Sequence, residues 1–206
     1  MSTFKTKVED LIGRTITDTT ALDDMLVSSA REVADTLPRK NLIQNATLTE
    51  VTSNPTDISD SRILSVSRNG FFANEIPYGQ SARVADSGSI YFADTTQDRD
   101  PVFYYKGSSL FIIDTPTSSQ KGEILSFAYP AVFDSSNNIN NATAIDNFPS
   151  SAEYVVALGA AAKFMVKLSS EDNANEDIEL QNSTLASAQN LEQDYRAELD
   201  RIKEQK

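Results

Sequence analysis

The sequence contains no cysteine and no histidine among its 206 residues. Without thiols and imidazoles it cannot build Cys-His or Ser-His-Asp nucleophilic machinery, a Cys/His zinc site, or Cys or His ligation of haem. Only carboxylate, Lys, Tyr or Ser-Lys chemistry remains for an enzyme. We therefore expect a protein with no enzymatic activity, no cofactor and no metal ion, and we assign no catalytic residues.

Basic residues are also scarce. There are 18 Lys and Arg against 30 Asp and Glu, which gives a formal net charge of −12 at pH 7. A chain that binds nucleic acid through its main surface carries a basic patch or stripe, because the phosphate backbone attracts Lys and Arg. This composition therefore argues against nucleic-acid binding as the main task of the fold.

Long apolar runs are missing as well. The longest apolar stretch is 154–165, it is interrupted by Lys163, and it is far shorter than the roughly 20 residues of a transmembrane helix. We expect no membrane association. Acidic residues at Glu9 and Asp10 and the absence of an apolar signal segment near the start predict synthesis in the cytoplasm.

Three candidate sites fail their templates. The seven glycines are scattered singly, so no glycine-rich phosphate loop is present. A calcium loop counted from Asn173 places Ile178 where glycine is needed and Thr184 where glutamate is needed, which predicts a solvated turn. Ser118 and Lys121 have the Ser-x-x-Lys spacing, but they lie in a predicted exposed turn rather than on a buried helix.

Residues 1–40 are predicted to form two helices. Ser2 can cap the first helix, and Gly13 is expected to end it because glycine readily adopts the left-handed backbone of a helix C-terminus. Thr20 can cap the second helix, and Pro38 is expected to end it. Apolar residues recur there every three or four positions and predict one buried face: Leu22, Leu26, Ala30, Val33 and Leu37.

Residues 41–149 are predicted to form an inserted β domain. The Asn69-Gly70 pair between apolar segments is a strong hairpin signal, and Gly107 marks a second hairpin. The predicted strands are 62–67, 71–76, 89–93, 102–105, 110–113 and 123–129. Because no segment of helical period separates them, neighbouring strands are expected to be antiparallel in a small barrel or sandwich.

Residues 150–206 are predicted to complete the helical part. A polar stretch at 134–147 is expected to be a mobile surface connection, helices resume at Pro149, and 169–175 forms the turn before a final helix from about Asp177. The predicted class is thus α+β: an antiparallel helical bundle of N- and C-terminal helices with an inserted antiparallel β domain. We expect these side chains to pack the bundle and its subunit contacts: Leu26, Val33, Tyr154, Leu158, Ala161, Met165, Leu191 and Tyr195.

Three parts of the sequence carry a resemblance to a known family. They are the opening Ile16-Thr17-Asp18-Thr19-Thr20 with its helix, the strand segments 63–70, 101–104 and 121–125, and the string 148–158 followed by a charged helix with Tyr195. Together they resemble the head-to-tail adaptor (connector) proteins of tailed bacteriophages, the class called tail tubular protein A in short-tailed phages.

The resemblance implies a homododecameric ring in the virion neck, between the portal and the tail. Such a ring widens the DNA channel, lets double-stranded DNA pass without specific binding, and contacts the portal together with a tail nozzle or stopper protein. Adaptors of this type hold the portal with C-terminal segments. The positions of this chain to which portal binding is thereby assigned are Arg196, Leu199, Arg201, Ile202 and Lys203.

Helix-spaced charge pairs near the C-terminus stabilise a helix only weakly, so we expect this end to fray in the free subunit and to become ordered on docking.

Two alternative functions stay open. One is another virion part, such as a tail terminator, stopper or decoration protein. A carbohydrate-active enzyme that uses two carboxylates also stays open, since any two of the acidic residues could face each other across a cleft.

Overall fold

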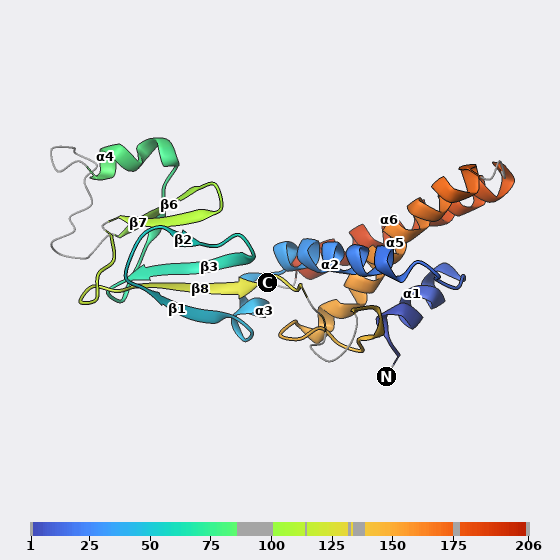
Figure 1. The fold of residues 1–206 in the computed structure, drawn as a ribbon, viewed down its shortest axis with the longest axis horizontal. Coiled ribbons are helices and arrows are strands. Elements are labelled where there is room, and N and C mark those ends of the chain that lie inside the picture. Colours follow the sequence, from blue (N-terminus) through green and yellow to red (C-terminus); the bar gives the residue numbers. More distant parts are fainter. Residues whose placement is uncertain are drawn as a thin grey trace. The chain divides into compact units, whose positions relative to one another are not determined.

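The computed structural model describes residues 2–85, 101–113, 115–131, 133, 139–174 and 178–204, and its fold is α+β, as predicted. The chain divides into two compact units (Figure 1). The helical unit contains the residues up to Asn45 together with those from Tyr129 onward, and the β unit is Ala46–Ala128. The β unit is therefore inserted between the two parts of the helical unit. Its boundaries differ from the predicted 41 and 149, chiefly because residues after Tyr129 pack with the helices.

The helical unit contains five α-helices within the described residues. They are α1 (Phe4–Ile12), α2 (Thr19–Thr36), α3 (Arg39–Ile43), α5 (Glu153–Ala174) and α6 (Ile178–Glu204). Helix α5 is central, since it packs against α6, α2 and α1. The predicted direct packing between the N-terminal and C-terminal helices is thus present in the structure.

The helix ends show which side chains cap the helices. Thr3, rather than Ser2, caps α1 by accepting the Thr6 N–H, and Gly13 ends this helix with a φ of 66°. Asp18, rather than Thr20, caps α2, because its Oδ1 accepts the Ala21 N–H at 3.0 Å. The second helix ends at Thr36, before the predicted Pro38, and the chain then forms the unpredicted short helix α3.

Helix α5 is longer than predicted. It follows a 3-10 turn at Ser150–Ala152 and continues to Ala174, so that most of the predicted turn at 169–175 is helical. Residues 175–177 lie outside the described residues. Residues 155–162 are buried without interruption, because alanine and glycine allow neighbouring helices to approach on several sides.

The segment 139–148 is packed on the helices rather than forming the predicted mobile connection. The backbone N–H and side-chain amide of Asn140 both donate to Asp23 Oδ1, at 2.8 and 2.9 Å. The Phe4 N–H donates to the Ala142 carbonyl at 2.9 Å, and Ala142 and Ile145 are buried. This segment therefore belongs to the core of the helical unit. The preceding part of the predicted connection, residues 134–138, lies outside the described residues.

The described strands of the β unit form two sheets. The first has the order β1-β8-β3-β4 and the second β2-β7-β6-β5. Their bounds are β1 (Thr47–Val51), β2 (Thr56–Asp57), β3 (Ser61–Arg68), β4 (Phe71–Phe72), β5 (Asn74–Glu75), β6 (Val102–Lys106), β7 (Ser109–Ile113) and β8 (Gly122–Ala128), with the short helix α4 (Ser81–Ala85) after β5. Side chains of both sheets share one apolar core: Val51, Val66, Phe103, Leu110, Ile112 and Ile124. The unit is thus a small sandwich.

Both predicted hairpins are present. Asn69 and Gly70 have φ angles of 50° and 83° between β3 and β4, and Gly107 has a φ of 62° between β6 and β7. Among the described strands, β5 and β6 pair in parallel over two residues, contrary to the prediction, while the other pairs are antiparallel. The predicted strand at 89–93 lies outside the described residues.

Candidate interaction surface on the helical unit

Most of the side chains assigned to packing lie inside the helical unit. Those that are buried are Leu26, Val33, Leu158, Ala161, Met165 and Tyr195, whereas Leu191 is half-buried. Tyr154 differs, since it is 55% exposed and takes no part in the core of a single chain. The buried part of α5 begins one residue later, at Val155, and the four-residue spacing from Tyr154 to Leu158 does not mark its inner face.

The buried Tyr195 of α6 joins a polar network at the surface of the helical unit, in which the exposed Glu32 is the shared acceptor. Its hydroxyl donates to Glu32 Oε2 at 3.1 Å, while Lys163 Nζ donates to Glu32 Oε1 at 2.7 Å. Burial raises the pKa of the Tyr195 phenol far above its ordinary value, and the negative charge of Glu32 raises it further. Ser29 Oγ, close to the same ring, is fully buried and has no hydrogen-bond partner in the described part of the chain.

A second polar cluster joins the loop after α1 to the last turn of α5 and the second turn of α6. Arg14 Nη2 donates to Thr184 Oγ1 at 3.0 Å, and that hydroxyl donates to Asp172 Oδ2 at 2.8 Å. Arg14 Nη1 lies 3.5 Å from the same Asp172 oxygen. The side chain of Thr184, the position at which the calcium template requires glutamate, is therefore buried as a link between two helices.

Lys167 connects α5 to the start of α2. Its Nζ lies 2.8 Å from Asp18 Oδ2 and 2.7 Å from Glu171 Oε1. The hydrogen bond from Lys167 lowers the pKa of the Asp18 carboxyl, and the same bond raises the pKa of Lys167. Asp18 therefore both caps α2 and forms an ion pair with α5.

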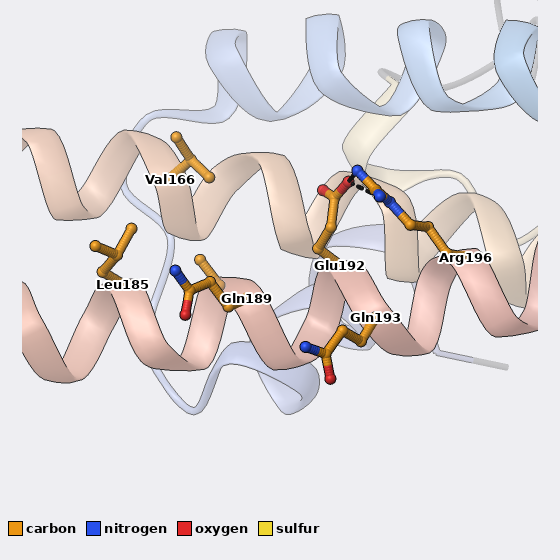
Figure 2. Close-up of a pocket in the computed structure, with 7 residues that line it drawn as sticks. Val166, Leu185, Gln189, Glu192, Gln193 and Arg196 are labelled. Carbon is orange, nitrogen blue, oxygen red and sulfur yellow. Dashed lines mark hydrogen bonds and ion pairs between the residues drawn. The ribbon is translucent and has the colours of Figure 1, made fainter.

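An open groove lies on the surface between α5 and α6 (Figure 2). Its volume is about 370 Å³, and it is lined by Val166, Leu185, Ala188, Gln189, Glu192, Gln193 and Arg196. Val166 and Leu185 are 51% and 41% exposed, whereas Ala188 is buried. Glu192 Oε1 accepts hydrogen bonds from Arg196 Nε and Nη2, at 2.9 and 2.7 Å. Apolar side chains, two carboxamides and an ion pair suit the binding of another side chain or helix.

Sequence reasoning did not find this groove. The apolar spacing of α6 assigns Leu185 to the buried face, but Thr184 is buried in its place and Leu185 is exposed. Val166 falls outside the expected stripe of α5 and gave no signal.

The residues assigned to portal binding lie on the last turns of α6, which is helical through Glu204. Arg196, Arg201 and Lys203 are exposed, Leu199 is half-buried and Ile202 is buried. The three basic residues form ion pairs with acidic residues three or four positions earlier, namely Glu192, Glu198 and Asp200. Ile202 is buried and α6 is helical through Glu204, while fraying in the free subunit stays a prediction.

No group of acidic residues within the described ranges could hold a metal ion, and no described helix is long and apolar enough to span a membrane. The sequence matches no protein-family model and no curated protein.

Proposed function

We propose that the protein is a virion structural protein of a tailed bacteriophage, a head-to-tail adaptor that forms a ring between portal and tail and lines the DNA channel. The observation that carries the proposal is which segments of the chain form the helical unit. Helices α1 and α2 from the beginning of the chain and α5 and α6 from its end pack together, and the β unit is an insertion between them. This is the order of parts that the resemblance to adaptors implies.

Two physical features support the proposal. Helix α5, which contains four alanines and one glycine over 155–162, is buried throughout that stretch, which suits a rigid helical frame. The formal net charge of −12 repels phosphates, so DNA could slide along a surface of this kind without adhering to it. In this proposal twelve copies form the ring, and the portal and a tail nozzle or stopper protein are its partners.

The portal contact is assigned to the exposed basic residues at the end of α6. Arg201 and Lys203 have side chains that are 65% and 55% exposed, and each forms a surface ion pair within the same helix. Such pairs contribute only about 0.2–1 kcal/mol, so both cations can exchange their partners for acidic groups of a portal at small cost.

The test is negative-stain microscopy of the protein mixed with its portal, combined with co-sedimentation. We expect a ring at one end of the portal. The double substitution Arg201→Glu with Lys203→Glu should abolish co-sedimentation while circular dichroism stays unchanged. The matched control is Arg39→Glu with Lys40→Glu, which makes the same change of charge on the exposed positions of α3 and should bind normally.

The outcomes separate the alternatives. Absence of any complex with the portal would reject the adaptor proposal. Rings that bind a tail component but not the portal would instead favour a terminator or stopper protein. Equal binding by the α6 and α3 variants would place the portal contact elsewhere on the chain.

A further inference from the structure

Strand β1 is the one long edge strand among the described strands of the β unit. The two sheets have their edges at β1, β4, β2 and β5, and each of these strands except β1 has only two residues. Short edge strands protect a sheet against unwanted pairing, because they offer few free backbone groups to another chain. Strand β1 has five residues, without proline or glycine, and lies at the border of its sheet (Figure 1). This edge therefore lacks the protection that the other edges have.

The outer side of β1 has free backbone groups. Alternate residues of an antiparallel strand direct their N–H and C=O groups to opposite sides of the strand. One side of β1 forms the ladder with β8, and no described residue pairs with the other side. Thr47, Leu48, Thr49 and Glu50 are all exposed, so another chain can reach this edge. The chemistry that matches such a row of donors and acceptors is a second extended backbone.

The side chains at this edge add a requirement for the partner. Leu48 lies opposite Leu125 of β8, and Glu50 lies opposite Glu123. Leu48 and Glu50 are two residues apart and therefore lie on the same face of the sheet. Leu48 is 59% exposed. A strand added to β1 places one of its side chains beside Leu48 and another beside Glu50.

Carboxylates outnumber ammonium groups around Glu50. Its Oε2 lies 2.6 Å from Lys121 Nζ, whereas Oε2 of the neighbouring Glu123 accepts a hydrogen bond from the uncharged Ser67 hydroxyl at 3.0 Å. Like charges directly opposite each other in a ladder are unfavourable, so a cation in a third strand is favoured beside Glu50. A second copy of β1 would bring another carboxylate instead, because Glu50 is its only charged residue. The edge therefore matches a different, basic strand better than it matches itself.

We propose that β1 is the docking site for an extended segment of another protein, which pairs antiparallel with Thr47–Val51 and adds a strand to the sheet. The segment has a basic residue beside Glu50 and an apolar residue beside Leu48, with one residue between them. Because the pairing is antiparallel, the basic residue comes first in the sequence of the partner. This site goes beyond the proposed function and does not rest on it, since its argument uses the β unit alone.

The test uses a fluorescently labelled synthetic peptide with the core Thr-Lys-Thr-Val-Thr, followed by fluorescence anisotropy. One control peptide has Glu in place of Lys. The other keeps every side chain but is N-methylated at the central Thr and at Val, so that one methyl group faces β1 whichever residues form the hydrogen bonds. We expect the Lys peptide to bind about fivefold more tightly than either control, which is the size of a favourable cross-strand pair.

Variants of the full chain locate the site. Glu50→Lys should weaken binding of the Lys peptide and strengthen binding of the Glu peptide, because it reverses the excess of charge at the edge. The matched control is Glu75→Lys, since Glu75 is exposed on β5, an edge strand of two residues, and this variant should bind as the wild type does. Hydrogen exchange reports the backbone pairing directly. The amides of 47–51 should exchange several-fold more slowly when the Lys peptide is bound.

Three results would overturn the inference. Equal binding of the Lys peptide and the N-methylated peptide, or unchanged exchange over 47–51, would show that no ladder forms. Equal binding of the Lys peptide by Glu50→Lys and Glu75→Lys would place the peptide elsewhere. Slower exchange over 47–51 as the protein alone is concentrated would assign the edge to a second copy. None of these experiments contains a portal, so their failure is distinct from failure of the adaptor proposal.

Discussion

The aromatic ring of Tyr195 on α6 packs against the backbone of Gly159 on α5. A methyl group at position 159 would lie 2.8 Å from Tyr195 Cε2 and 3.1 Å from Ser29 Oγ. Glycine at this position therefore allows α2, α5 and α6 to approach one another, although glycine within a helix is less favourable than alanine by about 1 kcal/mol. The polar network of Tyr195 and Glu32 depends on this close approach.

Gly159→Ala should destabilise the protein despite its better helix propensity. The added methyl group meets the ring of Tyr195, which the surrounding helices hold in place, and overpacking of this kind costs about 1–3 kcal/mol. For a chain of this length the melting temperature should fall by several degrees, at roughly 2–4 °C per kcal/mol. The control is Gly79→Ala, because a methyl group there meets nothing within 4 Å. Equal melting curves for the two variants would show that the ring can move aside.

Tyr195→Phe should remove the hydrogen bond to Glu32 and cost about 1 kcal/mol at neutral pH. The pKa of Tyr195 is raised in the folded protein, so as pH rises past about 10 the unfolded chain loses this proton first. The free energy of unfolding of the wild type should then decrease with pH. The difference in this free energy between the wild type and Tyr195→Phe should become smaller. Urea unfolding between about pH 8 and pH 11 measures the difference, and an advantage that stays constant across this range would contradict the assignment.

Leu158→Asp should unfold the helical unit. Leu158 is 2% exposed, and an unpaired carboxylate at a buried position costs at least about 3–5 kcal/mol. Tyr154→Asp, one turn earlier on the same helix, is the matched control, and it should leave the melting curve nearly unchanged because Tyr154 is exposed. Thermal unfolding followed by circular dichroism distinguishes them. A large decrease in the melting temperature of Tyr154→Asp would indicate that Tyr154 makes a contact that the single chain does not show.

Asp18→Ala should lower the melting temperature more than Thr20→Ala, because Asp18 caps α2 and bonds to Lys167. Asp18→Asn keeps a capping side chain without the charge and should fall between the wild type and Asp18→Ala. The pKa of Asp18 is lowered in the folded state. Its stabilising effect is therefore present above its ordinary pKa near 4 and is lost as pH falls through the lowered value. A larger effect of Thr20→Ala would restore Thr20 as the cap.

Features that depend only on neighbouring residues could be predicted from the sequence. The hairpin turns at Asn69-Gly70 and Gly107, and the end of α1 at Gly13, were predictable because a positive φ is a local property that few residues adopt at low cost. The α+β class was also predictable, because the apolar periods of helices and strands are visible within short segments of the sequence. The existence of α1, α2, α5 and α6 followed from spacing, whereas the short α3 and α4 were not predicted. The cap of α2 was not determined by the sequence, because Asp18 and Thr20 are both good capping residues.

Which apolar positions are covered depends on the packing of the whole chain and could not be predicted from local pattern. Tyr154, Val166 and Leu185 differ little in sequence from buried neighbours, and their exposure depends on where other helices approach. The bond between Tyr195 and Glu32 joins residues 163 positions apart, and the parallel pairing of β5 with β6 joins segments that no local pattern connects. The α5–α6 groove is of this kind, because a groove exists only after two helices have packed. Sequence periodicity reports the tendency of a residue to be buried, whereas the partner that buries it is set by the whole fold.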